Sequence, residues 1–191
     1  MAGRQAKLLT PHALRHLLAY AARSRAPVRD RVMVLLSAKA GLRAGEIAKL
    51  TWQMVLDANG RVAECIALSD RAAKYGSGRT VPIHPDLRHA LRQLRKECGA
   101  EGPVIRSLRG GALQPNSVVN WFVTACAEVG LDGCSSHSGR RTFITRAART
   151  ANLVGGSLRD VQLLAGHRSI ETTQRYIEAD TDAQRRLIRR I

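Results

Sequence analysis

The chain has 191 residues and a formal net charge of +16, from 31 Lys and Arg against 15 Asp and Glu, and this length predicts one domain with its own core. Apolar residues make up 45% of the chain, which excludes a disordered basic tail; aromatic residues make up only 4%, which argues against a β-sandwich or a carbohydrate-stacking surface. No apolar run approaches the roughly 20 residues of a membrane span, and the N-terminus carries no signal-peptide core.

The spacing of apolar residues predicts a mainly helical chain. Proline or polar caps mark where most of these helices begin. The expected helices, in chain order, begin at Pro11, Pro27, Ala44, Pro85, Pro115, His137, Leu158 and Ser169, and Asp180 or Thr181 can cap a last one.

One stretch in the middle of the chain has the pattern of a small antiparallel sheet. Residues 62–68 and 80–83 are typical of short strands, and the segment 74–78, rich in glycine, lies in the loop between them. We therefore expect a β-hairpin with Lys74 in its loop.

Two helical faces can be assigned from the pattern alone. In the helix that begins at Pro85, an apolar stripe contains Leu87, Leu91, Leu94 and Cys98, and we expect Arg88, Arg92, Arg95 and Lys96 to lie away from it. In the helix that begins at Pro115, the expected stripe contains Val119, Phe122, Cys126 and Val129.

The positive charge is mostly arginine, 26 residues against 5 lysines. The planar guanidinium binds phosphate through two hydrogen bonds at once, so a charge this large favours a polyanionic partner such as nucleic acid. A G+C-rich genome, or an arginine surface that is merely solvated, would produce the same composition.

The cysteines indicate neither a metal site nor a disulfide framework. The four cysteines, Cys65, Cys98, Cys126 and Cys134, show no C-x-x-C spacing and no matching histidine pair. Free thiols are typical of a reducing cytoplasm. We therefore predict a cytoplasmic protein with no metal and no cofactor.

Five segments hold polar residues that a hydrophobic core would not require. Each is weak alone, because short motifs match by chance. The His and Arg of one segment are three residues apart at a helix N-terminus, so both can reach one ligand. The candidates are Arg43 and Glu46 in Gly41–Glu46, Lys74 in the hairpin, His137 with Arg140, His167 after Gly166, and Tyr176 nine residues later.

Together these segments resemble the catalytic domain of the tyrosine recombinase (phage integrase) family. That family's pattern is an Arg in a G-L-R-x-x-E box, a Lys in a β-hairpin, H-x-x-R, and then G-H with a Tyr about nine residues on. The order and separations fit from about Thr10 to the C-terminus, and Lys74 lies five residues before the segment Arg79–Ile83.

The resemblance implies DNA strand cleavage and rejoining without metal or ATP. Arg43 and Arg140 would hold the nonbridging oxygens of the scissile phosphate. Tyr176 would attack phosphorus and form a 3′-phosphotyrosyl link. His137 would accept or share the phenol proton, and Lys74 would protonate the 5′-hydroxyl leaving group. His167 would bind the scissile phosphate, and Glu46 would orient part of the site through arginine or backbone partners.

The sequence departs from the family pattern in three places. The box reads His-Ser-Gly-Arg-Arg over 137–141, where many relatives have Leu before the Arg and His after it. Residues 150–157 are an expected insertion, predicted as a surface loop. We expect the usual N-terminal core-binding domain to be absent, with the chain either an excised fragment or a natural minimal recombinase. The expected division is an N-terminal extension (1–9), a catalytic domain (10–179) and a helical tail (180–191).

The resemblance also implies the partners: double-stranded DNA, and copies of the same chain in a tetramer on paired sites, to which the tail would contribute. Accessory DNA-bending or directionality proteins are further candidates, and the expected location is a bacterial cytoplasm, in association with the nucleoid. Three other functions remain as alternatives: a type IB topoisomerase-like relaxation activity, a non-catalytic DNA-binding protein on an integrase scaffold, and an RNA-binding module. The last is disfavoured because this chain has no aromatic strand of the kind that RNA-binding modules use.

Overall fold

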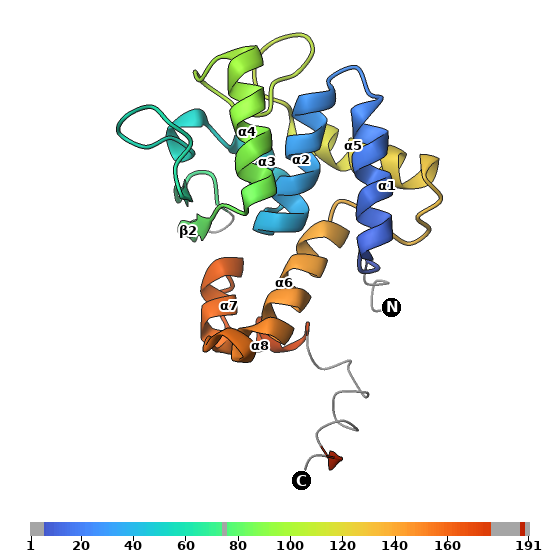
Figure 1. Cartoon of the computed structure of the whole chain (residues 1–191), viewed down its shortest axis with the longest axis vertical. Coiled ribbons are helices and arrows are strands. Elements are labelled where there is room, and N and C mark those ends of the chain that lie inside the picture. The colour runs from blue at the N-terminus through green and yellow to red at the C-terminus, as the bar shows by residue number, and fades with distance from the viewer. Residues whose placement is uncertain (1–5, 74–75, 177–187, 190–191) are drawn as a thin grey trace.

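The computed structural model describes residues 6–73, 76–176 and 188–189. It confirms the expected fold class, since helices surround one small two-stranded antiparallel sheet (Figure 1). In chain order the elements are α1 (Pro11–Ala22), α2 (Pro27–Ala40), α3 (Ala44–Lys49), η1 (Trp52–Met54), β1 (Cys65–Leu68), β2 (Arg79–Pro82), α4 (Pro85–Cys98), α5 (Pro115–Glu128), α6 (Ser138–Thr150), η3 (Ala151–Val154), α7 (Leu158–Ala165) and α8 (Ile170–Gln174).

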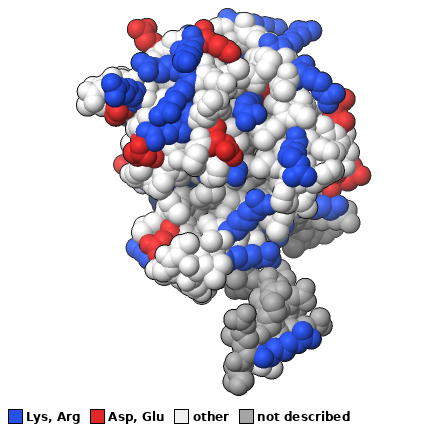
Figure 2. Space-filling model, in the orientation of Figure 1, with Lys and Arg blue, Asp and Glu red and all other residues white. Residues whose placement is uncertain are grey.

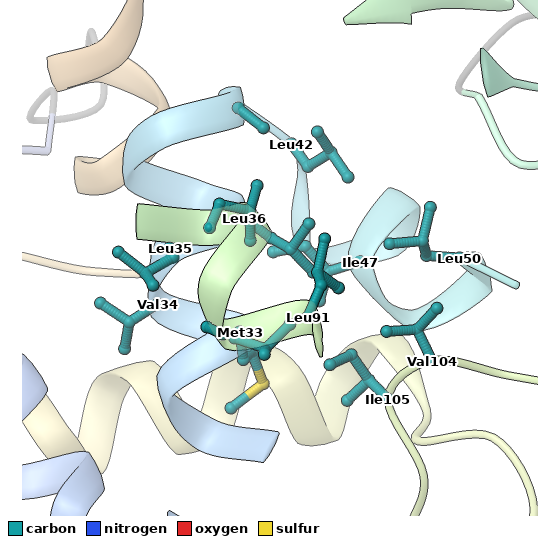
Figure 3. Packing of buried hydrophobic residues seen from close by; sticks show 14 of the residues in the cluster. Met33, Val34, Leu35, Leu36, Leu42, Ile47, Leu50, Leu91, Val104 and Ile105 are labelled. Atoms are coloured by element: carbon teal, nitrogen blue, oxygen red, sulfur yellow. The ribbon is translucent and has the colours of Figure 1, made fainter. Parts of the chain in front are cut away.

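Helix α2 is the centre of the larger core. Nine of its fourteen residues are buried, and it packs against α1, α4 and α6. A helix that is buried on several sides does not show a single apolar stripe. The buried residues of α2 accordingly include a continuous run from Val32 to Ala38. Figure 3 shows Leu35 and Leu36 of α2 among side chains from α3, α4 and the loop 104–105.

A second, smaller core holds the C-terminal helices together. Ile144 of α6, Ala151 of η3, and Val161 and Ala165 of α7 are buried in it, and Tyr176 packs against it. Figure 1 shows α6, α7 and α8 grouped below the larger set of helices. Because α6 also packs on α2, it joins the two cores.

The predicted hairpin is present, with a shorter first strand than expected. β1 and β2 pair antiparallel, with Ile66 opposite Val81. The expected strand began at Val62, but Val62 instead forms an isolated bridge with Leu56, because the chain turns at 57–60 before β1 begins. Lys74 lies outside the described residues.

Some predictions about helix faces were wrong in detail. Cys98 is exposed at the end of α4, and Val118 rather than Val119 is the buried valine of α5.

The expected surface loop 150–157 does lie at the surface, with Leu153 exposed, but it contains the short helix η3. The helix expected to begin at Ser169 is α8, which begins at Ile170, with Ser169 as its N-cap, and ends at Gln174. The predicted tail lies outside the described residues except for 188–189.

Candidate functional site

Five of the seven candidate residues line one pocket. Its volume is about 630 Å³, and it opens between the start of α3, the start of α6 and the segment after α7. The lining includes four arginines and two histidines and no acidic residue. The full lining is Ala6, Arg43, Gly133, Cys134, Ser135, His137, Arg140, Arg141, His167, Thr172, Arg175 and Tyr176.

Arg43 is held at the start of α3 by the carboxylate of Glu46. The backbone N–H of Arg43 donates to Glu46 Oε2 at 2.9 Å, and Arg43 Nη1 donates to Glu46 Oε1 at 2.8 Å. Glu46 occupies the third position of the helix, so it satisfies a backbone donor that the helix leaves free at its N-terminus. The pair fixes the direction in which the Arg43 guanidinium leaves the helix.

Glu46 also binds a second arginine, Arg79, at the start of β2. Arg79 Nη1 and Nη2 each donate to one carboxylate oxygen at 3.0 Å, in the two-bond geometry that fits guanidinium to carboxylate. Burial alone would raise the pKa of Glu46, but its hydrogen bond and charge interaction with Arg79, together with Arg43, lower the pKa to about 2. Glu46 is therefore a buried anion that neutralises part of a strongly cationic site.

Arg140 is almost completely buried at the start of α6. Its Nη1 donates to the carbonyl of Gly41 at 2.6 Å, and its Nη2 donates to the carbonyl of Ala165 at 2.7 Å and lies 3.0 Å from His167 Nε2. Burial, and then the charge of Arg43, lower the pKa of Arg140 to about 9, which leaves it charged at neutral pH. A guanidinium has five N–H groups, so two of them stay available to a ligand.

His167 directs both ring nitrogens at protein groups. Because arginine only donates, Nε2 accepts from Arg140, and the ring hydrogen on Nδ1 then points to Thr173 Oγ1 at 2.9 Å. Burial, and then the charges of Arg140, Arg43 and Arg79, lower the pKa of His167 to about 4. His167 thus helps to hold the guanidinium of Arg140, and because it also lines the pocket, its contact with a phosphate stays a prediction.

Tyr176 lies in the turn that follows α8 and faces the same pocket. Its ring stacks on that of His167, with centroids 5.6 Å apart and planes 21° apart. Its backbone N–H donates to the carbonyl of Thr173, the residue whose hydroxyl contacts His167. The phenol and the imidazole are therefore positioned by one short segment.

His137 and Arg140 belong to the same helix start but differ in environment. His137 is the N-cap of α6 and is exposed, with Nδ1 3.4 Å from Ser136 Oγ, whereas Arg140 is buried one turn later. Both line the pocket, as their spacing predicts. Lys74, the remaining candidate, lies outside the described residues, five positions before Arg79, where β2 begins.

Gly166 ends α7 in the left-handed conformation, at φ 63°, directly before His167. A Cβ at this position would lie 2.9 Å from Arg79 Cδ and Nη1. Arg79 Nε in turn donates to the carbonyl of Leu164 at 2.9 Å. Glycine thus permits both the helix end and the close approach of Arg79 to the segment that carries His167.

The sequence alone assigns no role to Arg79 or to Thr173. Arg79 begins the segment Arg79–Ile83, but an arginine at a strand start gives no signal by itself. Thr173 lies six residues after His167, and only the fold of α8 brings its hydroxyl to the ring. Both residues act on the candidate side chains and do not line the pocket.

Residues 6–9, which the sequence places in the N-terminal extension, are tied to the site. Lys7 N–H donates to the carbonyl of Gly133, and Leu9 N–H donates to Thr142 Oγ1 at 2.7 Å. Arg141 Nη1 donates to the carbonyl of Ala6 at 2.5 Å. These bonds hold the segment against α6 and the loop before it, and they place Ala6 in the lining of the pocket.

The described residues contain neither a metal cluster nor a membrane-spanning helix. Within 6–73, 76–176 and 188–189, no group of three or more His, Cys, Asp or Glu side chains is placed to hold a metal ion. In the same part of the chain, no helix has both the length and the apolar character needed to cross a membrane.

Comparison with known proteins gives consistent matches. Residues 7–183 match the model of the phage integrase family. The chain is 30% identical over 158 residues to tyrosine recombinase XerC of Brucella suis biovar 1 (strain 1330), covering 80% of this chain and 47% of that protein. It is 32% identical to XerC of Rhizobium meliloti (strain 1021), covering 80% and 46%. The chain thus spans about half the length of the curated relatives it matches.

Solved structures share the fold. The Tn1549 transposon integrase in complex with a circular intermediate DNA superposes with a TM-score of 0.74 at 18% identity, covering all of this chain and 67% of that one. A lambda integrase tetramer bound to a Holliday junction superposes with a TM-score of 0.70 at 21% identity, covering 89% and 47%.

Proposed function

Because the chain belongs to the phage integrase family, we propose that it is the catalytic domain of a site-specific tyrosine recombinase, which cleaves and rejoins DNA through a 3′-phosphotyrosyl intermediate on Tyr176. One observation carries the proposal. Arg43, Arg140, His167 and Tyr176 come from segments far apart in the sequence, and they converge on one pocket without acidic lining.

The cationic lining suits a phosphodiester on its way to a pentacovalent phosphorane. Arg43, fixed by Glu46, and the two free N–H groups of Arg140 would donate to the nonbridging oxygens. Because these donors are held by buried partners, little reorganisation is needed as charge develops. Arginine at both positions keeps the charge at all physiological pH values.

The phenol oxygen of Tyr176 would attack phosphorus, and the bond from phosphorus to the 5′-oxygen would break. The phenol proton would pass to His137 or to water beside it, since His137 is the exposed histidine of the pocket. The 5′-oxygen would take a proton from Lys74, the general acid that the family resemblance implies. The phosphotyrosyl link retains the energy of the broken bond, so the reverse attack by a 5′-hydroxyl rejoins the strand without ATP.

The same proposal assigns partners and location. Double-stranded DNA would be the substrate, and copies of this chain would assemble as a tetramer on paired sites, with accessory DNA-bending or directionality proteins as further partners. A solved relative is a tetramer on a Holliday junction, which supports this arrangement. We place the protein in a bacterial cytoplasm, in association with the nucleoid.

Two reactions measured side by side test this function. The first is strand exchange between two labelled duplexes that carry candidate sites, and the second is relaxation of supercoiled plasmid. Recombinant product supports the proposal, whereas relaxation without exchange indicates a topoisomerase-like enzyme. Salt-sensitive binding with neither product, under conditions where a XerC relative is active, indicates a scaffold that only binds.

A further inference from the structure

The helix α4 carries a second cationic pocket that the proposed chemistry does not use. It has a volume of about 640 Å³ and shares no lining residue with the catalytic pocket. Its charged side chains are Arg61, from the turn before β1, and Arg92, Arg95 and Lys96 of α4. Figure 2 shows basic side chains gathered over the part of the surface where Figure 1 places α4.

These four cations have no acidic partner among the residues that the structure describes. Arg88, on the same helix, provides the contrast, because its Nη2 lies 2.6 Å from Glu64 Oε1. The lining of the pocket contains no Asp or Glu, and Glu97, although on α4, is not part of it. Like charges that share a pocket repel one another, and a bound polyanion removes that repulsion.

The helix dipole accounts for two of the four cations in the α4 pocket but not for the other two. Arg95 and Lys96 lie in the last turn of α4, where the helix dipole stabilises cations. Arg92 lies a turn earlier, and Arg61 comes from a separate turn, in which its backbone N–H donates to Asp57. A Cβ at Gly60 would lie 3.9 Å from Arg95 Nη2, so the Arg95 guanidinium reaches over the turn that carries Arg61.

The pocket is at the end of α4 that is distant from the catalytic site. The N-terminal end of α4 is the end near the catalytic pocket. There, His84 Nε2 lies 3.3 Å from Lys39 Nζ. Lys39 precedes Gly41 by two residues, and the carbonyl of Gly41 accepts a hydrogen bond from Arg140. The fourteen residues of α4 extend about 20 Å at 1.5 Å per residue. A ligand at Arg92 and Lys96 is therefore well separated from one at Arg140.

We propose that the α4 pocket binds the phosphate backbone of duplex DNA, at a position separate from the strand held in the catalytic pocket. The identification of the polyanion as DNA rests on the proposed function. Three of the four cations are arginines, whose planar forks bind phosphate through paired hydrogen bonds. Arg92 and Lys96 are one helical turn apart on one face, so they can contact successive phosphates of a single strand.

The test compares two triple variants with the same net charge, +13. One is Arg61→Gln/Arg92→Gln/Lys96→Gln, in the α4 pocket. The control is Arg15→Gln/Arg23→Gln/Arg25→Gln, at exposed positions in and after α1. Affinity for a 40-base-pair duplex is measured over a range of salt concentrations, and thermal melting checks that each variant is folded. Each phosphate contact contributes about 0.9 to the slope of log K against log salt.

We expect the magnitude of this slope to fall by about 2 to 3 in the α4 variant and by less than about 1 in the control. Equal slopes in the two variants would overturn the inference, because only total charge would then matter. If the triple variant melts early, the single variants Arg92→Glu and Arg15→Glu, which share a net charge of +14, repeat the comparison. A second assay asks whether protein bound to an immobilised duplex captures a second, labelled duplex. Capture indicates that the backbone bound by the α4 pocket belongs to a duplex other than the one in the catalytic pocket. Covalent adduct formation in the same proteins tests the proposed function separately.

Discussion

Arg79 and Glu46 are 33 residues apart in the sequence, yet their side chains form a two-bond ion pair with both N–O distances at 3.0 Å. Arg79 is also bonded through Nε to the carbonyl of Leu164. One guanidinium therefore connects the hairpin, the helix that presents Arg43, and the segment that presents His167. Its side chain is 5% exposed, so these contacts exclude most water.

The first prediction concerns Arg79→Lys. Lysine keeps the charge but cannot make the paired contact with Glu46 and the bond to Leu164 at once. We expect strand cleavage to slow by about 10- to 100-fold, the range that small misplacements of reacting groups produce. Single-turnover formation of the covalent adduct measures it, with DNA affinity measured alongside.

The matched control for this variant is Arg71→Lys, at an exposed arginine of the same hairpin. We expect the control to cleave at the wild-type rate and both variants to bind DNA as the wild type does. If Arg79→Lys cleaved as fast as Arg71→Lys, the connecting role of Arg79 would be refuted.

The second prediction concerns Gly166→Ala. Alanine at φ 63° costs about 1 to 2 kcal/mol, and its Cβ would also press against Arg79. Gly155→Ala is the control, because Gly155 has φ 74° and no atom near the position of a Cβ. We expect Gly166→Ala to lower the free energy of unfolding by more than Gly155→Ala does, in urea titration. Equal losses would show that Arg79 gives way without cost.

The third prediction is a pH dependence that originates at His167. Its pKa falls from 6.5 to about 4 on folding, so the unfolded chain binds more protons between these values. His167 therefore contributes stability that is present above about pH 6.5 and is lost as pH falls to 4, at most about 3 kcal/mol. Urea titrations of wild type and His167→Asn over this range measure it, and parallel curves for the two proteins would contradict it.

The fourth prediction uses Glu46, whose pKa falls to about 2 in the folded chain. This carboxylate contributes stability that is present above its ordinary pKa of 4.5 and is lost as pH falls towards 2. Glu46→Gln removes the anion between two arginines, and we expect a loss of about 3 kcal/mol at neutral pH. Its stability should then change less than that of the wild type between pH 4.5 and 2, and an unchanged pH profile would argue against the buried pair.

The sequence predicted the helices well because local signals mark them. Pro11, Pro27, Pro85 and Pro115 each begin a helix where expected, since proline suits the first helical position. The order of Arg43, Arg140 and Tyr176 in a known pattern also predicted a common site for them; the three line one pocket, and their catalytic roles stay predictions.

The contacts within the site could not be predicted, because they depend on tertiary geometry. The two carbonyls that Arg140 binds, of Gly41 and Ala165, lie 99 and 25 residues away. No local pattern indicates that His167 accepts a hydrogen bond from Arg140, or that Glu46 binds Arg79 of β2 as well as Arg43. Faces of buried helices were also misjudged, as with Cys98, because period alone does not show where a helix end leaves the core.

The proposed reaction requires that Tyr176 become covalently linked to DNA. The direct measurement incubates the protein with nicked duplexes that bear candidate sites, denatures the mixture, and detects a protein–DNA adduct by electrophoresis and mass spectrometry. We expect an adduct on the peptide that contains Tyr176 and none with Tyr176→Phe at equal DNA binding. An adduct that persists in Tyr176→Phe, or that maps to another residue, would contradict it.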